Sequence, residues 1–143
     1  MKIFPFVAIS LLLTNAHGSM VAPPPPYGPV PTERQLAWHN MEFYGFVHFT
    51  VNTFTDKEWG YGDESPAVFN PTDFDARRIV QIFRDAGMRC VILTAKHHDG
   101  FCLWDTKTTD KKVTKSPIGV DVLARLRASC EKHGIKLAIY FSE

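Results

Sequence analysis

Cysteine is scarce in this chain, and the few cysteines form no recognisable pattern. There are three, Cys90, Cys102 and Cys130, which is an odd number. No pair has the short spacing of a structural zinc site, and the set does not suggest a disulfide framework. We therefore exclude the small disulfide-rich and zinc-finger classes and expect buried free thiols.

An excess of charge of one sign is also missing. The chain has 16 Lys and Arg against 15 Asp and Glu, a formal net charge of +1, and its cations are scattered among the acids. A surface that binds nucleic acid needs a dense basic patch to neutralise phosphates. The composition therefore argues against a nucleic-acid partner and favours a neutral small-molecule substrate.

The apolar run near the start is too short to cross a membrane, which takes about 20 residues. It covers residues 3–13, follows Lys2 and precedes the small-residue pattern Ala16-His17-Gly18. A positive charge, a short apolar core and small residues are typical of a secretory signal peptide. We expect a signal peptide over residues 1–18, no membrane association after its removal, and a secreted, lysosomal or periplasmic location.

Proline gathers between residues 23 and 31, so residues 19–31 are expected to be an extended, poorly packed lead-in. The folded part is expected over residues 32–143, since the chain is 45% hydrophobic and 13% aromatic, enough for one core. A helix is expected over residues 32–40, with Thr32 as its cap. The other expected elements are strands over 44–50 and from 90 onward, helices over 75–86 and 121–133, and a strand over 136–142.

The apolar residues Ile79, Ile82, Phe83 and Ala86 recur at helical spacing and predict the buried side of the second helix. Gly87 and Gly134 end helices that lead directly into strands. Helix and strand alternation of this kind implies an α/β fold with parallel strands and right-handed crossovers. A (β/α)8 TIM barrel needs eight strands and about 250 residues, so we expect only its first three strands and their helices, in a truncated chain.

Polar side chains follow the apolar run Cys90–Leu93, in the order Lys96-His97-His98-Asp99-Gly100. The carboxyl ends of buried strands are where α/β proteins hold catalytic and binding groups. Successive side chains of an ideal strand point to opposite sides, so one of the two imidazoles should lie on the turn itself. Asp99 is expected to cap this turn or orient an imidazole, and Lys96 to pair with a carboxylate. A lone histidine is more often a structural residue, and a zinc site built from His48, His97, His98 and Asp99 is a further alternative.

Several motifs in order carry a family resemblance. They are Phe46-Val47-His48, Lys57-Glu58-Trp59, Phe69-Asn70-Pro71, Asp85-Ala86-Gly87-Met88, and Thr94 to Phe101. The chain resembles the amino-terminal part of the α-L-fucosidases of glycoside hydrolase family 29, from about Glu33 to Ser142. Two stretches depart from the family pattern: Phe49-Thr50, where many members have Trp-Gly, and Ile118-Gly119-Val120-Asp121.

The resemblance implies a (β/α)8 catalytic domain that removes terminal L-fucose from glycans by a retaining double displacement. It implies no cofactor and no metal. The family's nucleophile is an aspartate after the fourth strand, so we expect both the nucleophile and the acid/base carboxylate beyond Glu143. Neither is assigned to a residue of this chain, which alone is expected to be inactive. A non-catalytic fucose-binding remnant and a metal-dependent barrel hydrolase are the alternatives.

By motif match, the resemblance also implies residues that line the fucose pocket. His and Glu side chains can serve the sugar's hydroxyl groups, and a Trp ring can cover its apolar face. Separately from the match, Glu58 and Trp59 suit an exposed loop, and Tyr140 suits a core layer of the barrel. The residues implied are His48, Glu58, Trp59, His97, His98 and Tyr140.

Overall fold

The computed structural model describes residues 21–143, and the signal peptide expected over residues 1–18 lies outside them. The chain divides into two units, residues 1–30 and residues 31–143. Residues 21–30 are exposed and contain no helix or strand. Among the described residues, no helix has the length and apolar character needed to span a membrane.

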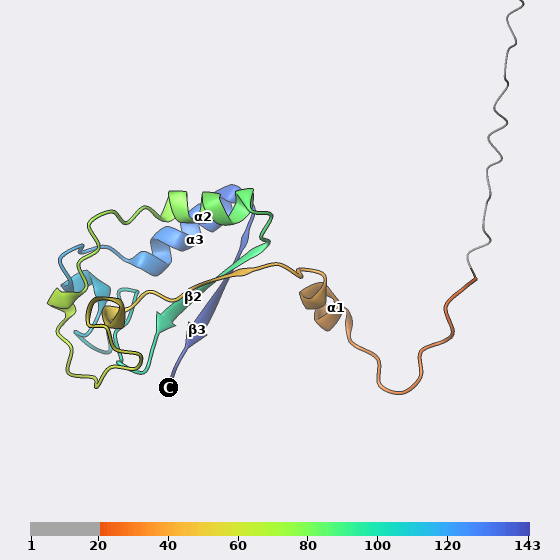
Figure 1. Ribbon diagram of the computed structural model, residues 1–143, viewed down its shortest axis with the longest axis horizontal. Coiled ribbons are helices and arrows are strands. Elements are labelled where there is room, and N and C mark those ends of the chain that lie inside the picture. Colours follow the sequence, from red (N-terminus) through yellow and green to blue (C-terminus); the bar gives the residue numbers. More distant parts are fainter. Residues whose placement is uncertain (1–20) are drawn as a thin grey trace, which may run out of the picture. The chain divides into compact units, whose positions relative to one another are not determined.

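The unit that begins at Pro31 contains a three-stranded parallel sheet in the order β1-β2-β3 (Figure 1). Strand β1 spans Gly45–Val47, β2 spans Cys90–Lys96 and β3 spans Lys136–Phe141. The predicted parallel α/β arrangement is confirmed for these three strands. Because all three run the same way, their carboxyl ends meet at one edge of the sheet.

Each α-helix begins where a polar side chain caps its first turn. The Thr32 hydroxyl accepts from the Gln35 N–H before α1, Glu33–His39. The Asp75 carboxylate caps α2, Ala76–Asp85, and the Asp121 carboxylate caps α3, Val122–His133. These side chains satisfy backbone N–H groups that have no partner inside the helix. All three helices predicted from the sequence are confirmed.

Helices α2 and α3 pack together over one face of the sheet (Figure 1). Gly45 allows the close approach of α2, since a Cβ atom there would lie 1.6 Å from Phe83 Cε1. The core between the helices and the sheet includes fully buried apolar residues from every layer: Val80, Val91, Leu93, Val122 and Leu126.

Two local predictions are corrected. The buried stripe of α2 is centred on Ala76 and Val80, with Ile79 and Phe83 partly buried, whereas Ile82 is 59% exposed. Both stripes have helical spacing, and only the position of the sheet decides between them. Strand β1 is also shorter than expected, because the Thr50 side chain caps a 3₁₀ turn over Val51–Phe54 that takes the chain away from the sheet.

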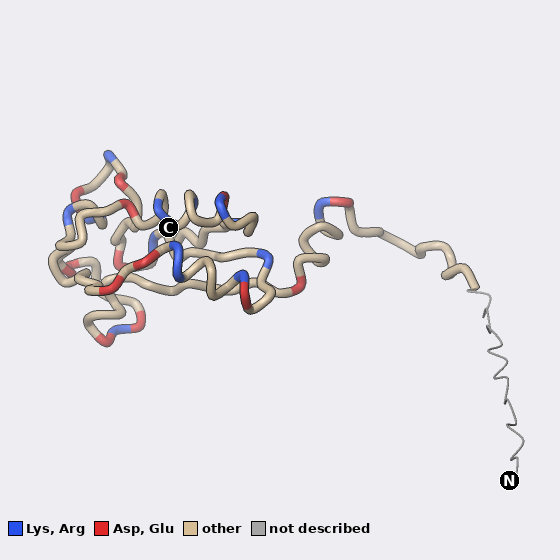
Figure 2. Tube along the Cα trace, turned by 90° about the horizontal axis from the view of Figure 1, so that it is seen from above, with Lys and Arg blue, Asp and Glu red and all other residues tan. Residues whose placement is uncertain are grey.

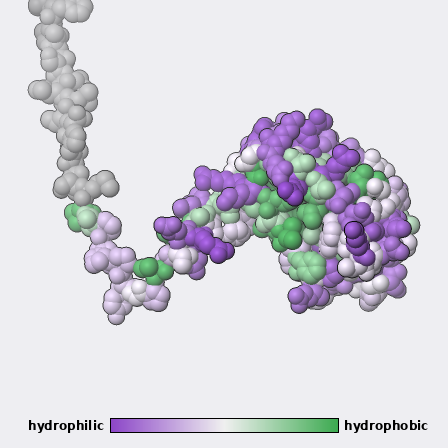
Figure 3. Space-filling model, turned by 180° about the vertical axis from the view of Figure 1, so that it is seen from behind, coloured by the Kyte–Doolittle hydropathy of each residue, from purple (hydrophilic) through white to green (hydrophobic). Residues whose placement is uncertain are grey.

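The surface carries mixed charge and one apolar area. Lys and Arg are interspersed with Asp and Glu along the described chain (Figure 2). In the space-filling view, apolar side chains gather near the middle of the folded unit, with hydrophilic side chains around them (Figure 3). The edge strands contribute exposed apolar residues, including Phe46, Ile139 and Phe141, each about half exposed. In this unit, therefore, the apolar burial is concentrated on the side that the helices cover.

Candidate functional site

The candidate site begins at an irregularity in β2. Thr94 pairs with Tyr140 and Lys96 pairs with Phe141, so Ala95 is an extra residue in β2. Such bulges bend a strand and redirect the side chains that follow. The next residues are His97 and then a turn at residues 98–99, which confirms that one of the two imidazoles lies on the turn.

Five of the six predicted pocket residues form one connected group of rings at this edge. The His97 ring centroid lies 4.7 Å from that of His48 and 4.8 Å from that of His98. Trp59 stacks on His98, with centroids 4.8 Å apart and planes 14° from parallel. Tyr140 completes the group, 6.1 Å from His97. Residues far apart in the chain, on β3 and on the segments that follow β1 and β2, are thus brought together.

Phe46 is a sixth ring in this group and was not predicted. Its centroid lies 5.9 Å from that of Tyr140 and 6.3 Å from that of His48. It is half exposed, on the sheet face that α2 and α3 leave open. Its place in the motif Phe46-Val47-His48 was the available signal, but an aromatic residue in a short strand is more often read as core.

Two of the imidazoles, those of His48 and His98, form hydrogen bonds with hydroxyl groups. His48 Nδ1 lies 3.0 Å from Thr94 Oγ1, and His98 Nδ1 lies 3.0 Å from Ser142 Oγ. The His48 contact uses one ring nitrogen, and an imidazole has a second nitrogen that can bond a ligand hydroxyl. In His98 the Nε2 atom also lies 3.4 Å from the same Ser142 oxygen. Sequence reasoning missed both hydroxyl residues. A threonine inside an otherwise apolar strand was the signal for Thr94.

His97 is the most buried of the three imidazoles. It is 9% exposed, and its Nδ1 atom has no hydrogen-bond partner in the described part of the chain. Burial lowers the pKa of His97 below its ordinary value, and the nearby His48 and His98 lower it further. The carboxylates of Asp99 and Glu58 act in the opposite direction. The arrangement therefore favours a neutral imidazole at the centre of the group.

Asp99 has the turn-capping role expected from the sequence. Its Oδ1 accepts from the Phe101 N–H at 2.6 Å, and its Oδ2 accepts from Asn52 Nδ2 at 3.1 Å. Within residues 21–143, Lys96 pairs with no carboxylate. Its ammonium group donates to the Ser142 carbonyl oxygen and lies 5.0 Å from the centroid of the Phe141 ring. The expected carboxylate partner of Lys96 stays a prediction.

Glu58 is the one predicted pocket residue that makes no ring contact. Its side chain is exposed on the loop that carries Trp59, close enough for its charge to act on His97. Glu64 lies beneath the same loop and was not predicted. Although burial alone raises its pKa, hydrogen bonds from the backbone N–H groups of Tyr61 and Gly62 and from Lys111 lower the pKa of Glu64 to about 2.

Glu143 is the acidic residue that follows the third strand. It comes directly after Ser142, at the same edge of the sheet as the ring group, and its side chain is exposed. Because the nucleophile and the acid/base carboxylate are expected beyond Glu143, this glutamate is assigned to neither role. The positions of the two catalytic carboxylates stay a prediction.

The described residues offer little for a metal ion. Within residues 21–143, no group of three or more His, Cys, Asp and Glu side chains is arranged to hold one. Cys90, Cys102 and Cys130 are free and buried, as predicted, and burial raises the pKa of each thiol.

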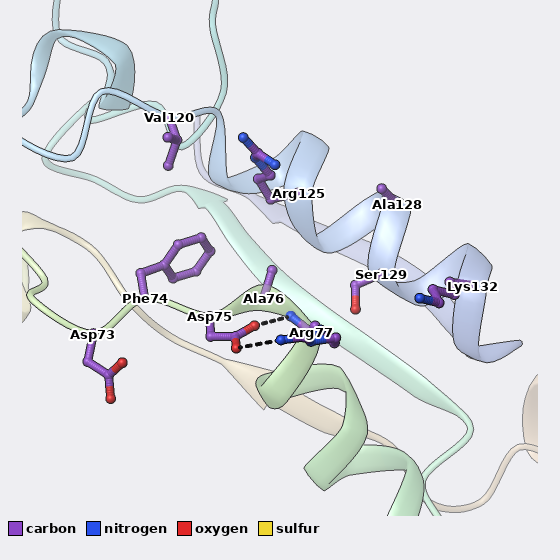
Figure 4. Close-up of a pocket in the computed structure, with 10 residues that line it drawn as sticks. All are labelled: Asp73, Phe74, Asp75, Ala76, Arg77, Val120, Arg125, Ala128, Ser129 and Lys132. Carbon is purple, nitrogen blue, oxygen red and sulfur yellow. Dashed lines mark hydrogen bonds and ion pairs between the residues drawn. The ribbon is translucent and has the colours of Figure 1, made fainter.

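A separate hollow of about 740 Å³ lies between α2 and α3 (Figure 4). It contains none of the predicted pocket residues. Arg125 and Lys132 line it from α3, and on the opposite wall Asp75 caps α2 and pairs with Arg77 at 3.7 Å. Its chemistry is that of a mixed-charge surface, whereas the ring group combines apolar faces with imidazole and hydroxyl groups.

Imidazoles, aromatic rings and hydroxyls at the carboxyl edge of a parallel α/β sheet are typical of an enzyme that acts on a polar organic molecule. Comparison with known proteins makes the class specific. Residues 27–143 match the family model described as alpha-L-fucosidase. The chain belongs to the α-L-fucosidase family, glycoside hydrolase family 29.

Individual relatives agree with this assignment. Alpha-L-fucosidase 1 of Arabidopsis thaliana is 44% identical over 143 aligned residues, which cover 97% of this chain and 28% of that protein. Among solved structures, a glycoside hydrolase 29 family member from an unknown rumen bacterium is 49% identical, with a TM-score of 0.76, covering 80% of this chain and 21% of that one. The chain thus spans less than a third of the length of these relatives.

Two further solved structures are similar to this chain and carry ligands. A Ruminococcus gnavus GH29 fucosidase in complex with fucose is 36% identical, with a TM-score of 0.70, covering 78% of this chain and 24% of that one. A Bacteroides thetaiotaomicron GH29 alpha-L-fucosidase, described as a trapped covalent intermediate with 2-fluoro-fucosyl fluoride, is 26% identical, with a TM-score of 0.68, covering 81% of this chain and 31% of that one.

Proposed function

We propose that this protein hydrolyses terminal α-L-fucose from fucosylated glycans, and that its described residues form the sugar-recognition part of the active site. The convergence of His48, Trp59, His97, His98 and Tyr140 on one group of rings carries the proposal. Four of these lie at or beyond the ends of their strands, and Trp59 reaches them from a loop. Family membership and the fucose complex of the related R. gnavus enzyme support it.

The proposed pocket suits the chemistry of a fucose ring, which has three free hydroxyl groups, a methyl group and an apolar face. A neutral His97 provides both a donor and an acceptor for hydroxyl groups. Trp59, 58% exposed, presents a broad apolar surface beside them. A sugar with a misplaced hydroxyl leaves one of these buried polar groups unpaired, which gives the site its selectivity.

The burial of His97 also contributes to recognition. Its Nδ1 atom is buried and has no hydrogen-bond partner among the described residues, so a ligand hydroxyl placed beside it would complete its hydrogen bonding. Hydrogen bonds made in such low-dielectric surroundings are stronger than bonds made in water. We therefore assign His97 the largest share of the hydroxyl recognition by the described residues.

We further propose a retaining double displacement, in a complete (β/α)8 barrel whose first three strands are β1, β2 and β3. In this mechanism one carboxylate attacks the anomeric carbon and a second protonates the departing oxygen, then activates water. No residue up to and including Glu143 is assigned to either carboxylate. The covalent intermediate described for the related B. thetaiotaomicron enzyme supports a retaining route.

The proposal includes a route to the secretory pathway, because Met1 to Gly18 has the pattern of a signal peptide. A fucosylated glycan or glycoconjugate is the proposed partner. Amino-terminal sequencing of the protein from its source tests the location. A mature chain that starts at Ser19 supports the proposal, and one that retains residues 1–18 contradicts it.

The activity is tested with the full protein. Titration with L-fucose should show binding, and L-rhamnose, a 6-deoxy sugar with differently oriented hydroxyls, should bind at least about ten-fold more weakly. An aryl α-L-fucoside should be hydrolysed, with the α-anomer of fucose as the first product seen by NMR. Binding without hydrolysis would leave a fucose-binding protein, and absence of both would overturn the proposal.

His97→Gln should reduce fucose affinity in the same titration, because glutamine cannot place a ring nitrogen at the centre of the group. His39→Gln is the matched control, since His39 lies exposed at the end of α1, away from the ring group. Equal affinity of both variants would remove His97 from the pocket.

A further inference from the structure

Glu64 is a buried carboxylate that makes no contact with the ring group. Its side chain is 3% exposed. Its oxygens accept from the backbone N–H of Tyr61 at 2.8 Å and of Gly62 at 3.0 Å. The ammonium groups of Lys57 and Lys111 lie 3.5 and 3.4 Å from it. Glu64 and these four partners form a cluster, called the clasp below, that fixes the conformation of the loop of residues 57–62.

Gly60 shows how tightly this loop is held. Its φ of +70° is a conformation that glycine adopts without strain. A Cβ atom there would lie 2.6 Å from Asn52 Oδ1 and 2.9 Å from Glu64 Oε1. Asn52 in turn donates to Asp99, which caps the turn containing His98. The loop backbone at Gly60 therefore packs directly against the side chains of Glu64 and Asn52.

Trp59 precedes Gly60 and depends on this support. More than half of its surface is exposed, and its ring contact is the stack on His98. Burial in a core therefore does not hold the indole in place. The position of the indole over His98 therefore depends on the conformation of the loop backbone, which the hydrogen bonds of Glu64 stabilise.

We propose that Glu64 is a positioning residue for the fucose pocket, which holds Trp59 in its stack on His98 by clasping the 57–62 loop. Through Lys111 the same carboxylate joins the loop after β1 to the loop after β2. Its role in sugar binding depends on the proposed function, whereas its role in placing Trp59 does not. Glu64 touches no sugar and acts only through the loop.

The test uses Glu64→Gln in the full protein, a change that keeps the shape and removes the charge. L-fucose affinity should fall about ten-fold, since the loop loses its charge-assisted hydrogen bonds. The same substitution in a Trp59→Ala background should have no further effect on affinity, because Glu64 acts through Trp59. Such non-additivity is the signature of two residues that share one path. Additive losses in the double variant would overturn the proposal.

Tryptophan emission gives a second readout that needs no sugar. The signal of Trp59 is the difference between a protein and its Trp59→Phe variant. In the wild type the His98 ring covers one face of the indole, so acrylamide should quench this signal less than it quenches a free tryptophan. In Glu64→Gln the indole should lose this cover, and quenching by acrylamide should increase. Quenching equal to that of the wild type would refute the positioning role.

Two further variants keep the result interpretable. Glu131→Gln is the matched control, because its carboxylate makes an exposed ion pair with Arg127 on α3; it should change neither affinity nor emission. If Glu64→Gln does not fold, Lys111→Gln removes one cation from the same clasp and should weaken fucose binding about two- to three-fold. If the wild type binds no fucose, the proposed function fails, and the emission readout alone decides the role of Glu64.

Discussion

The helix-covered face of the sheet and its carboxyl edge bury different kinds of side chain. On the helix-covered face, Val91 and Leu93 are completely buried, and because they are apolar they require only close packing. At the carboxyl edge of the same strand, His97 and Asp99 are also buried, yet they are polar. Within the described chain, five buried side-chain polar atoms have no hydrogen-bond partner, and two of them, His97 Nδ1 and Asn52 Oδ1, lie at this edge. Most buried polar groups in proteins are paired, so these two atoms agree with the sugar-recognition role proposed for this edge.

This difference predicts which substitutions should reduce stability and which should reduce sugar recognition. Changes on the helix-covered face should reduce stability and leave recognition intact in whatever protein still folds. Changes at the carboxyl edge should reduce recognition at a smaller cost in stability. The following predictions test that separation, from the largest expected effect to the smallest.

Leu93→Ala should reduce the free energy of unfolding by about 3 kcal/mol, because it leaves a cavity in a fully buried position. Ile82→Ala is its control on α2 and should cost less than about 1 kcal/mol, since Ile82 is mostly exposed. Denaturant unfolding of the two variants measures both values. Equal losses would mean that Ile82 is covered in the folded protein.

Glu64 should make the protein sensitive to acid. Its pKa is about 2 in the folded state against an ordinary value of 4.5, so its stabilisation is fully present above pH 4.5 and disappears as the pH falls towards 2. The loss is on the order of 2–3 kcal/mol. Unfolding free energies measured at about pH 5 and pH 2.5 should therefore differ more in the wild type than in Glu64→Gln. An identical pH slope for both proteins would contradict the clasp.

Trp59→Ala should weaken L-fucose binding by about 1–2 kcal/mol, because the sugar loses an apolar surface. The stability of the protein should hardly change, since most of the indole is exposed. Calorimetry measures the affinity and thermal unfolding the stability. A large loss of stability with unchanged affinity would place Trp59 with the core and not with the site.

His97 should resist protonation. Burial lowers its pKa, so its ring remains neutral below the pH at which an ordinary histidine titrates. The unfolded chain takes up the proton first, so this term favours folding at higher pH and is lost as the pH falls through the folded pKa. NMR titration of histidine ring carbons, with His97→Gln to assign the signal, measures it. A midpoint above the ordinary histidine value would show that the Asp99 carboxylate outweighs burial.

Much of the secondary structure was predictable, because its signals are local. Thr32, Asp75 and Asp121 precede helices and cap them within two or three residues, and the left-handed Gly134 ends α3. The pocket residues came from motif resemblance, and the structure brings five of them together. The choice between Val80 and Ile82 as the buried side of α2 was beyond the sequence, because both fit the helical period.

The supports of the site were also beyond prediction. The bulge at Ala95 depends on how β2 pairs with β3, and Ser142 meets His98 only because those strands are neighbours. Glu64 looked like one acid in a polar loop, and only its burial beneath Gly60 distinguishes it. In each case the partner lies more than forty residues away or depends on the packing of the loop.

By itself, the sequence determined the order of helices and strands, their capped ends and the family to which the chain belongs. These depend on hydrogen bonds and side-chain patterns that act over a few residues. Only the tertiary structure decided which rings meet, which imidazole is buried and which carboxylate holds the loop. Those outcomes arise from pairs such as Asn52 with Asp99 and Lys111 with Glu64, each separated by 47 positions in the chain. Such contacts have no periodicity, because the fold and not the neighbouring sequence brings the two side chains together.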